Sequence, residues 1–160
     1  MQERVDLRGQ LTLQLINRAG EVVQSISRQN HIVTVGRQLL AELFAGDITP
    51  SKVNHIAVGT GDDPPPENDQ TQLVDERARN PIAEVMFVPA DDDTRVTARL
   101  TVIFENDQAN DDEDPENPGP LREAGIFNAA AGGTMYNRVV FEPVYKTDAF
   151  QLVMMWDVTF

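Results

Sequence analysis

The stretch Phe150-Gln-Leu-Val-Met-Met-Trp-Asp-Val-Thr-Phe160 decides the fold class of this chain. Apolar residues recur at every second position, which is the period of a half-buried β-strand. The inward face carries Phe150, Leu152, Met154, Trp156, Val158 and Phe160, and the outward face carries Gln151, Val153, Met155, Asp157 and Thr159. We therefore expect Trp156 to fill the core. Val153 and Met155 are apolar but face outward, and they are candidates for an interface with another subunit.

The same alternation occurs near the N-terminus and predicts a hairpin over residues 5–28. Residues 5–16 alternate apolar and polar side chains, and residues 21–28 form the returning strand. Between them, Asn17-Arg-Ala-Gly20 has the composition of a tight turn.

One segment, residues 34–45, has the spacing of a short helix. Its apolar residues are Leu39, Leu40, Leu43 and Phe44. We expect Thr34 to cap its N-terminus, and we expect Gly46 and Pro50 to end it.

The remaining chain, residues 53–160, is the main β-region. Short apolar or alternating segments predict strands over 53–58, 82–88, 95–104, 122–128 and 135–141, besides the final strand. Residues 71–79 are ambiguous between a helical turn and an extended edge segment. Strands and helices do not alternate, so we predict a mainly β fold: an antiparallel β-sandwich or partly open barrel with one short helix and long acidic loops. Residues 1–160 are expected to form a single domain.

The formal net charge of −13 comes from 26 acidic and 13 basic side chains. The acidic residues gather in three stretches without Lys or Arg, residues 62–69, 91–93 and 105–119. This composition offers no basic face, so we expect neither a nucleic-acid nor a membrane partner. The stretches are best explained as solvated loops. A calcium site, or a docking patch for a basic partner, is the alternative.

The chain shows no recognisable catalytic or cofactor-binding pattern. It has no cysteine, which excludes disulfides and zinc–thiolate sites. Gly59-Thr60-Gly61 lacks the further residues of a nucleotide-binding loop and predicts a tight turn. His31 and His55 lie in no metal-binding or catalytic spacing. No apolar run reaches the length of a membrane span, and no export signal is evident. We predict a soluble, non-enzymatic protein with no cofactor and no metal ligands.

Glu123 is the acidic residue most closely framed by apolar and small residues, in Leu121-Arg-Glu-Ala-Gly-Ile-Phe127. A buried glutamate is more often held by an arginine than used as a catalyst. We expect a structural ion pair between Glu123 and either Arg79 or Arg138.

Several motifs, taken in order, resemble structural proteins of tailed bacteriophages, and especially the N-terminal region of tail-collar fibre proteins. The motifs are His55-Ile-Ala-Val-Gly-Thr-Gly61, Leu73-Val-Asp-Glu76 with Arg79, Leu121-Arg-Glu-Ala-Gly-Ile-Phe-Asn128, Gly133-Thr-Met-Tyr-Asn-Arg138 and Tyr145-Lys146. They are preceded by Asn30-His-Ile-Val-Thr-Val-Gly36, so the resemblance covers roughly residues 30–160. The hairpin over 5–28 is an addition to that pattern, and no fibre shaft follows Phe160 in this sequence.

The resemblance implies a non-enzymatic virion protein located in the tail, collar or baseplate region and assembled in the host cytoplasm. Its partners would be other copies of itself, as a homo-oligomer, and other virion proteins. The shared motifs would hold turns and a Glu–Arg pair in place. A capsid cement or decoration protein is the first alternative. A calcium-dependent or carbohydrate-binding β-sandwich module is the second.

Overall fold

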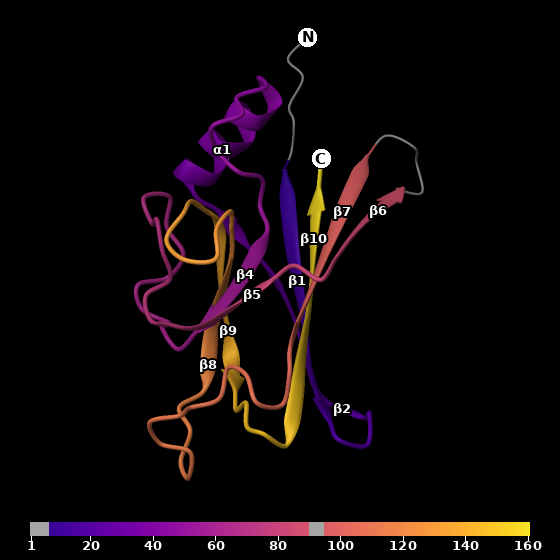
Figure 1. The fold of residues 1–160 in the computed structure, drawn as a ribbon, viewed down its shortest axis with the longest axis vertical. Helices are drawn as coiled ribbons and strands as arrows, with labels where there is room; N and C mark the ends of the chain where they lie inside the picture. The colour runs from indigo at the N-terminus through magenta and orange to yellow at the C-terminus, as the bar shows by residue number, and fades with distance from the viewer. Residues whose placement is uncertain (1–6, 90–94) are drawn as a thin grey trace.

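The computed structural model describes residues 7–89 and 95–160, which fold into two antiparallel β-sheets packed face to face (Figure 1). The first sheet has the strand order β2-β1-β10-β7-β6 and the second has the order β3-β9-β8-β4-β5. The strands of the first sheet are β1 (Arg8–Asn17), β2 (Val22–Gln29), β6 (Glu84–Pro89), β7 (Val96–Phe104) and β10 (Phe150–Thr159). Those of the second are β3 (His31–Ile32), β4 (His55–Gly59), β5 (Glu76–Pro81), β8 (Leu121–Phe127) and β9 (Met135–Val144). The prediction of a mainly β, antiparallel sandwich is confirmed.

The final strand, β10, is the centre of the first sheet because it pairs along its length with β1 on one side and β7 on the other. Trp156 lies between Leu11 and Leu100 in this register and is fully buried. Its indole Nε1 donates a hydrogen bond of 2.9 Å to Oδ1 of Asn30, so the one polar atom of this core side chain is satisfied. The alternation in the sequence therefore identified the inward face correctly.

The predicted N-terminal hairpin is formed by β1 and β2. Oδ1 of Asn17 accepts hydrogen bonds from the backbone N–H groups of Ala19 and Glu21, at 2.9 Å each. Gly20 follows with a φ of 83°, a conformation that favours glycine. The start of the predicted hairpin, Val5 and Asp6, lies outside the described residues.

The one helix among the described residues, α1 (Thr34–Phe44), lies against β9 at one end of the sandwich (Figure 1). The prediction that Thr34 caps this helix is wrong, because Thr34 is its first residue. The cap position is Val33, which makes no side-chain hydrogen bond. Gly36 allows the close contact, since a Cβ there would lie 2.0 Å from the carbonyl oxygen of Tyr136. Leu39 is buried in this contact, whereas Phe44 is 93% exposed.

The chain changes sheets between β5 and β6, which the sequence did not predict. The N–H of Ile82 donates to the carbonyl oxygen of Asn54, which directly precedes β4 of the second sheet. The N–H of Ala83 donates to the carbonyl oxygen of Thr101, in β7 of the first sheet. The amide of Asn80 also bonds the carbonyl oxygen of Ile103, at 2.8 Å. The sheets are therefore joined at this corner. Beyond it, β6 and β7 lean away from the second sheet, toward the end where α1 and the C-terminus lie (Figure 1).

The predicted hairpin over 82–88 and 95–104 is present as the β6–β7 pair, but its acidic turn, residues 91–93, lies outside the described residues. In the ambiguous segment 71–79, strand β5 begins at Glu76. The short strand β3 adds a further element that apolar patterning over two residues could not indicate.

Candidate functional site

The buried polar centre of the molecule is the ion pair between Glu123 of β8 and Arg138 of β9. Both side chains are fully buried, and Nε of Arg138 donates to Oε2 of Glu123 at 2.8 Å. Arg138 lies opposite Gly125 in the β8–β9 register, so the two charged side chains come from adjacent strands of the second sheet. Two buried charges need further hydrogen bonds to offset the loss of water. Both oxygens of Glu123 and two of the three guanidinium nitrogens of Arg138 are hydrogen-bonded, whereas Nη2 of Arg138 has no partner among the described residues.

Those further bonds go to the loop between β4 and β5. Oε1 of Glu123 accepts from the N–H groups of Gly61 (3.2 Å) and Asp75 (2.8 Å), and Oε2 accepts from that of Val74 (3.1 Å). On the other side, Nη1 of Arg138 donates to the carbonyl oxygen of Pro64 (2.7 Å) and to Oε1 of Gln70 (3.2 Å). The pair therefore fastens both ends and the middle of this loop to the second sheet.

The glycines of Gly59-Thr60-Gly61 make room for this arrangement. A Cβ on Gly59 would lie 2.2 Å from the carbonyl oxygen of Asp75, and one on Gly61 would lie 2.8 Å from Oε1 of Glu123. Thr60 adds a hydrogen bond from its hydroxyl to the carboxylate of Asp75. The motif is a close-packing site for the Glu123 carboxylate, in keeping with the structural turn expected from the sequence.

Arg79, the other expected partner of Glu123, pairs with Glu76 instead. Its Nε and Nη2 donate to the two carboxylate oxygens of Glu76 at 2.8 and 2.6 Å. Its guanidinium lies 3.7 Å from the centre of the Phe127 ring, and Nη1 bonds the carbonyl oxygens of Ala129 and Gly132. The expected ion pair of Glu123 is therefore formed with Arg138; Arg79 lies opposite Ala57 on edge strand β5, where it reaches the 129–132 turn.

Lys146 is a second buried cation, and it anchors the long acidic loop 105–119. Its Nζ donates to the carbonyl oxygens of Asn106 and Thr147, each at 3.1 Å, and to Oδ1 of Asn110 at 3.0 Å. Its side chain is fully buried, and burial lowers its pKa to about 8. The sequence had singled out this residue only as the last element of the motif series.

The acidic loop is also held by its own bonds. Asp111 accepts hydrogen bonds from the backbone N–H groups of Glu113, Asp114 and Gly119 and pairs with Arg77 at 3.1 Å. Those backbone bonds are the main cause of a lowered pKa for the Asp111 carboxyl. Within residues 7–89 and 95–160, no group of three or more His, Asp or Glu side chains is arranged to hold a metal ion.

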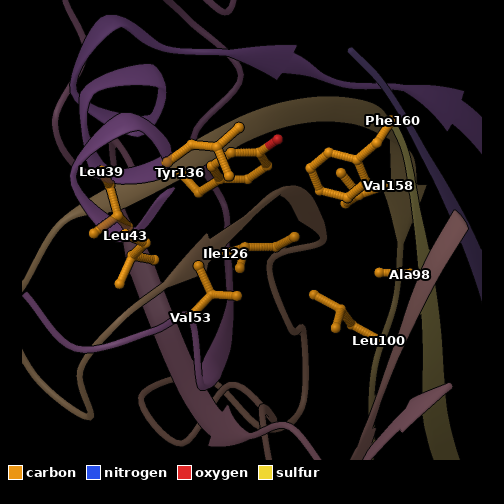
Figure 2. A pocket seen from close by; sticks show the side chains of 10 residues that line it. Leu39, Leu43, Val53, Ala98, Leu100, Ile126, Tyr136, Val158 and Phe160 are labelled. Atoms are coloured by element: carbon orange, nitrogen blue, oxygen red, sulfur yellow. The ribbon is translucent and has the colours of Figure 1, made fainter. Parts of the chain in front are cut away.

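An apolar pocket of about 100 Å³ lies between the two sheets at the end covered by α1 (Figure 2). In Figure 2, Leu39 and Leu43 of α1 lie across the pocket from Ala98 and Leu100 of β7. The residues that line it are Leu39, Leu40, Leu43, Val53, Ala98, Leu100, Ile126, Tyr136, Val158 and Phe160. The hydroxyl of Tyr136 has no hydrogen-bond partner among the described residues, and burial raises its pKa to about 12.

The elements around this pocket, and the loop that follows α1, also carry exposed apolar side chains. We call the pocket and these side chains the apolar end: Phe44, Ile48, Val85, Phe87, Val96 and Phe160, which are between 44% and 97% exposed. The acidic loop 105–119 lies at the opposite end of the molecule (Figure 1). The protein therefore has one apolar end and one acidic end.

The two interface candidates from the sequence, Val153 and Met155, do face outward from the middle of the first sheet. Both are only half-buried, and Met155 lies between Thr12 and Thr101 in the strand register. This face is mixed apolar and polar, and the apolar end is more exposed. A role for Val153 and Met155 in an interface remains a prediction.

The fold and the polar centre together define a two-sheet antiparallel β-sandwich whose long loops are fastened by buried charges. No protein-family model, curated protein or solved structure matches the chain. Among the residues that the structure describes, no helix is both long and apolar enough to cross a membrane. His31 lies opposite Arg138 in the β3–β9 register, but its ring is hydrogen-bonded to Asn68, and that of His55 is hydrogen-bonded to Asn54.

Proposed function

We propose that this chain is a non-enzymatic structural protein of a tailed-phage virion. It would assemble in the host cytoplasm in multiple copies, in the tail, collar or baseplate region where fibres attach. The observation that carries the proposal is the apolar end. Soluble monomers rarely expose large contiguous apolar patches, and such patches mark protein–protein contacts. Its most exposed side chains are Phe44, Ile48 and Phe87, at 93%, 97% and 71%, and a partner surface would cover them.

The buried charges give independent support. The motifs that resemble collar fibre proteins meet at Glu123 and Arg138, where every bond of the pair runs to this chain's own loop or strands. Charged groups used in this way stabilise a scaffold. The partner contacts of such a scaffold are made by its surface, through shape and apolar area.

Electron microscopy of gold-labelled particles tests the proposal directly. Antibodies against this chain should label particles from the phage or prophage that encodes it, at the tail, collar or baseplate. Label over the capsid would favour the cement or decoration alternative. Purified particles that lack the chain altogether would refute a virion role.

Light scattering on the purified protein at several concentrations tests the assembly part. A discrete oligomer is expected from the exposed apolar end. A strict monomer at every concentration would contradict self-assembly and favour an adaptor that associates only with another virion protein.

A further inference from the structure

β6 is an edge strand whose backbone is open to pairing. It is the last strand of the first sheet, and no strand in the described part of the chain pairs with its other side. Its middle, Val85-Met-Phe-Val88, is four apolar residues without a charge. Val85, Met86 and Phe87 are 53%, 47% and 71% exposed. Natural sheets usually protect such edges with charged residues, proline or a bulge, because the free N–H and C=O groups invite another strand.

The opposite edge of the same sheet shows that protection. β2 reads VVQSISRQ, with polar residues through its middle, and its pairing with β1 is interrupted by a bulge between Leu15 and Ile16. Arg28 of β2 forms an ion pair with Glu142, and Gln24 bonds the carbonyl oxygen of Pro143 at 3.2 Å. One edge of the sheet is therefore blocked and tied to β9, and the other is left open.

The inward side of β6 continues the apolar end. Val85 lies opposite Leu100, and Phe87 lies opposite Ala98. Residues directly opposite in an antiparallel pair share a face, and Leu100 and Ala98 line the pocket. A strand added beside β6 would thus satisfy the open backbone groups and also cover Val85 and Phe87.

We propose that this added strand is β6 of a second copy, paired antiparallel about a two-fold axis at Met86. In this register Met86 faces Met86 of the second copy, Val85 faces its Phe87, and Glu84 faces its Val88. The axis stands perpendicular to the sheet, so inward side chains meet inward side chains. The register uses Glu84 to Val88 and leaves Pro89, which has no N–H to donate, outside the paired segment. The two first sheets become one continuous sheet, and the interface is self-complementary as two-fold symmetry requires.

The paired segment of β6, residues 84–88, carries little charge, which permits a second copy at this edge; the acidic stretch 91–93 follows Pro89 and lies outside the paired residues. Each chain carries a formal charge of −13, so two copies can approach closely only where acidic side chains are sparse. In the proposed register the one acidic residue of β6, Glu84, faces an apolar valine and no other carboxylate. The acidic loop 105–119 lies at the far end of the molecule from the apolar end (Figure 1).

The antiparallel arrangement also explains how the open end is covered. The sheets are joined at the corner formed by Ile82 and Ala83, and they diverge toward the other end of β6. Two-fold pairing brings the closed corner of each copy beside the diverging end of the other. The inference rests on the self-assembly part of the proposed function and is independent of its location in a virion.

A single-cysteine crosslink tests the register, because the natural chain contains no cysteine. Met86→Cys places two thiols opposite each other at the axis, so mild oxidation should convert the protein into a disulfide-linked dimer of doubled mass. Ser25→Cys, at an exposed position on the blocked edge β2, is the matched control and should remain monomeric on non-reducing electrophoresis. Equal crosslinking of the two variants, or none of Met86→Cys, would overturn the pairing.

Light scattering on Phe87→Lys gives a second readout that needs no crosslink. The side chain is mostly exposed, so the variant should fold, and a lysine on the edge should convert the dimer to a monomer. Added salt should strengthen the wild-type dimer, since it screens the repulsion between two acidic chains. A wild-type trimer, or an oligomer that Phe87→Lys leaves intact, would overturn β6 pairing while self-assembly stands. A crosslinked dimer absent from phage particles would retain the pairing and refute the virion role.

Discussion

Replacing Glu123 with glutamine is the sharpest test of the buried polar centre. The substitution preserves shape but removes the charge that faces Arg138, and it turns one acceptor oxygen into an NH₂ group. If Oε2 becomes the NH₂ group, it faces Nε of Arg138 and the N–H of Val74, which are both donors. The flipped amide would instead face the N–H groups of Gly61 and Asp75. No orientation of glutamine therefore satisfies all four donors.

The expected cost follows from full burial. Removing one partner of a buried ion pair costs about 3–5 kcal/mol, because the other charge stays buried without compensation. A whole domain of this kind is stable by about 5–15 kcal/mol, so a large share of that stability should be lost. For a chain of this length the melting temperature should fall by roughly 6–20 °C. The guanidinium of Arg138 has no exposed surface through which it could regain water.

Denaturant unfolding followed by the fluorescence of Trp156, the single tryptophan, measures this loss. Asp157→Asn is the matched control, because Asp157 forms an equally well-aligned pair with Arg99 (2.7 and 2.8 Å) whose side chains are 31% and 41% exposed. An exposed pair is worth at most about 1 kcal/mol. Hydrogen exchange at Gly61, Val74 and Asp75 should accelerate only in Glu123→Gln. A Glu123→Gln protein as stable as Asp157→Asn would refute the structural role of the pair.

The other predictions concern Lys146, Gly59, Tyr136 and calcium. Lys146→Met should raise protease cleavage within residues 105–119, because three bonds that anchor this loop are lost. The pKa of Lys146 is about 8 in the folded protein and 10.5 ordinarily, so the unfolded chain binds more protons between these values. The wild-type free energy of unfolding should therefore rise between about pH 8 and pH 10 from this residue, and Lys146→Met should remove that rise. Gly59→Ala should destabilise by about 1–3 kcal/mol, because its methyl group would meet the Asp75 carbonyl, whereas Gly119→Ala, with 3.3 Å of clearance, should cost less. Tyr136→Phe should stabilise the fold by about 1 kcal/mol or leave it unchanged, because the lost hydroxyl is buried without a partner among the described residues. Calcium should leave the melting temperature unchanged, and a rise that chelator reverses would favour the calcium-dependent module.

The alternation of apolar and polar residues was enough to predict the long strands, because successive side chains of a β-strand point to opposite faces of the sheet. It identified β10, the β1–β2 hairpin and the burial of Trp156 without tertiary information. It could not predict that β5 and β6 belong to different sheets, because that depends on backbone bonds of Ile82 and Ala83 to distant strands. Phe44 fits the apolar spacing of α1 and is nevertheless exposed, since the helix contacts β9 only on the side of Gly36 and Leu39.

The polar centre was predicted in part for a similar reason. Apolar neighbours in sequence indicated that Glu123 would be buried, and burial demanded an arginine. Choosing between Arg79 and Arg138 required the register, which places Arg138 opposite Gly125 on the strand next to Glu123. The role of Lys146 had no signal in its local sequence, because its partners Asn106 and Asn110 belong to a loop some forty residues earlier.

The geometry of Glu123 also bears on whether this centre can do chemistry. A carboxylate has about four lone-pair positions, and here four donors occupy them: the N–H groups of Gly61, Val74 and Asp75, and Nε of Arg138. A general acid or base must have a free position within reach of substrate, and a fully buried side chain with every acceptor used has none. Glu123 and Arg138 are thus committed to holding the 61–75 loop. What the molecule offers to other molecules is its surface, with the apolar middle of edge strand β6 at one end and the acidic loop at the other, and this division supports a subunit that works by assembly.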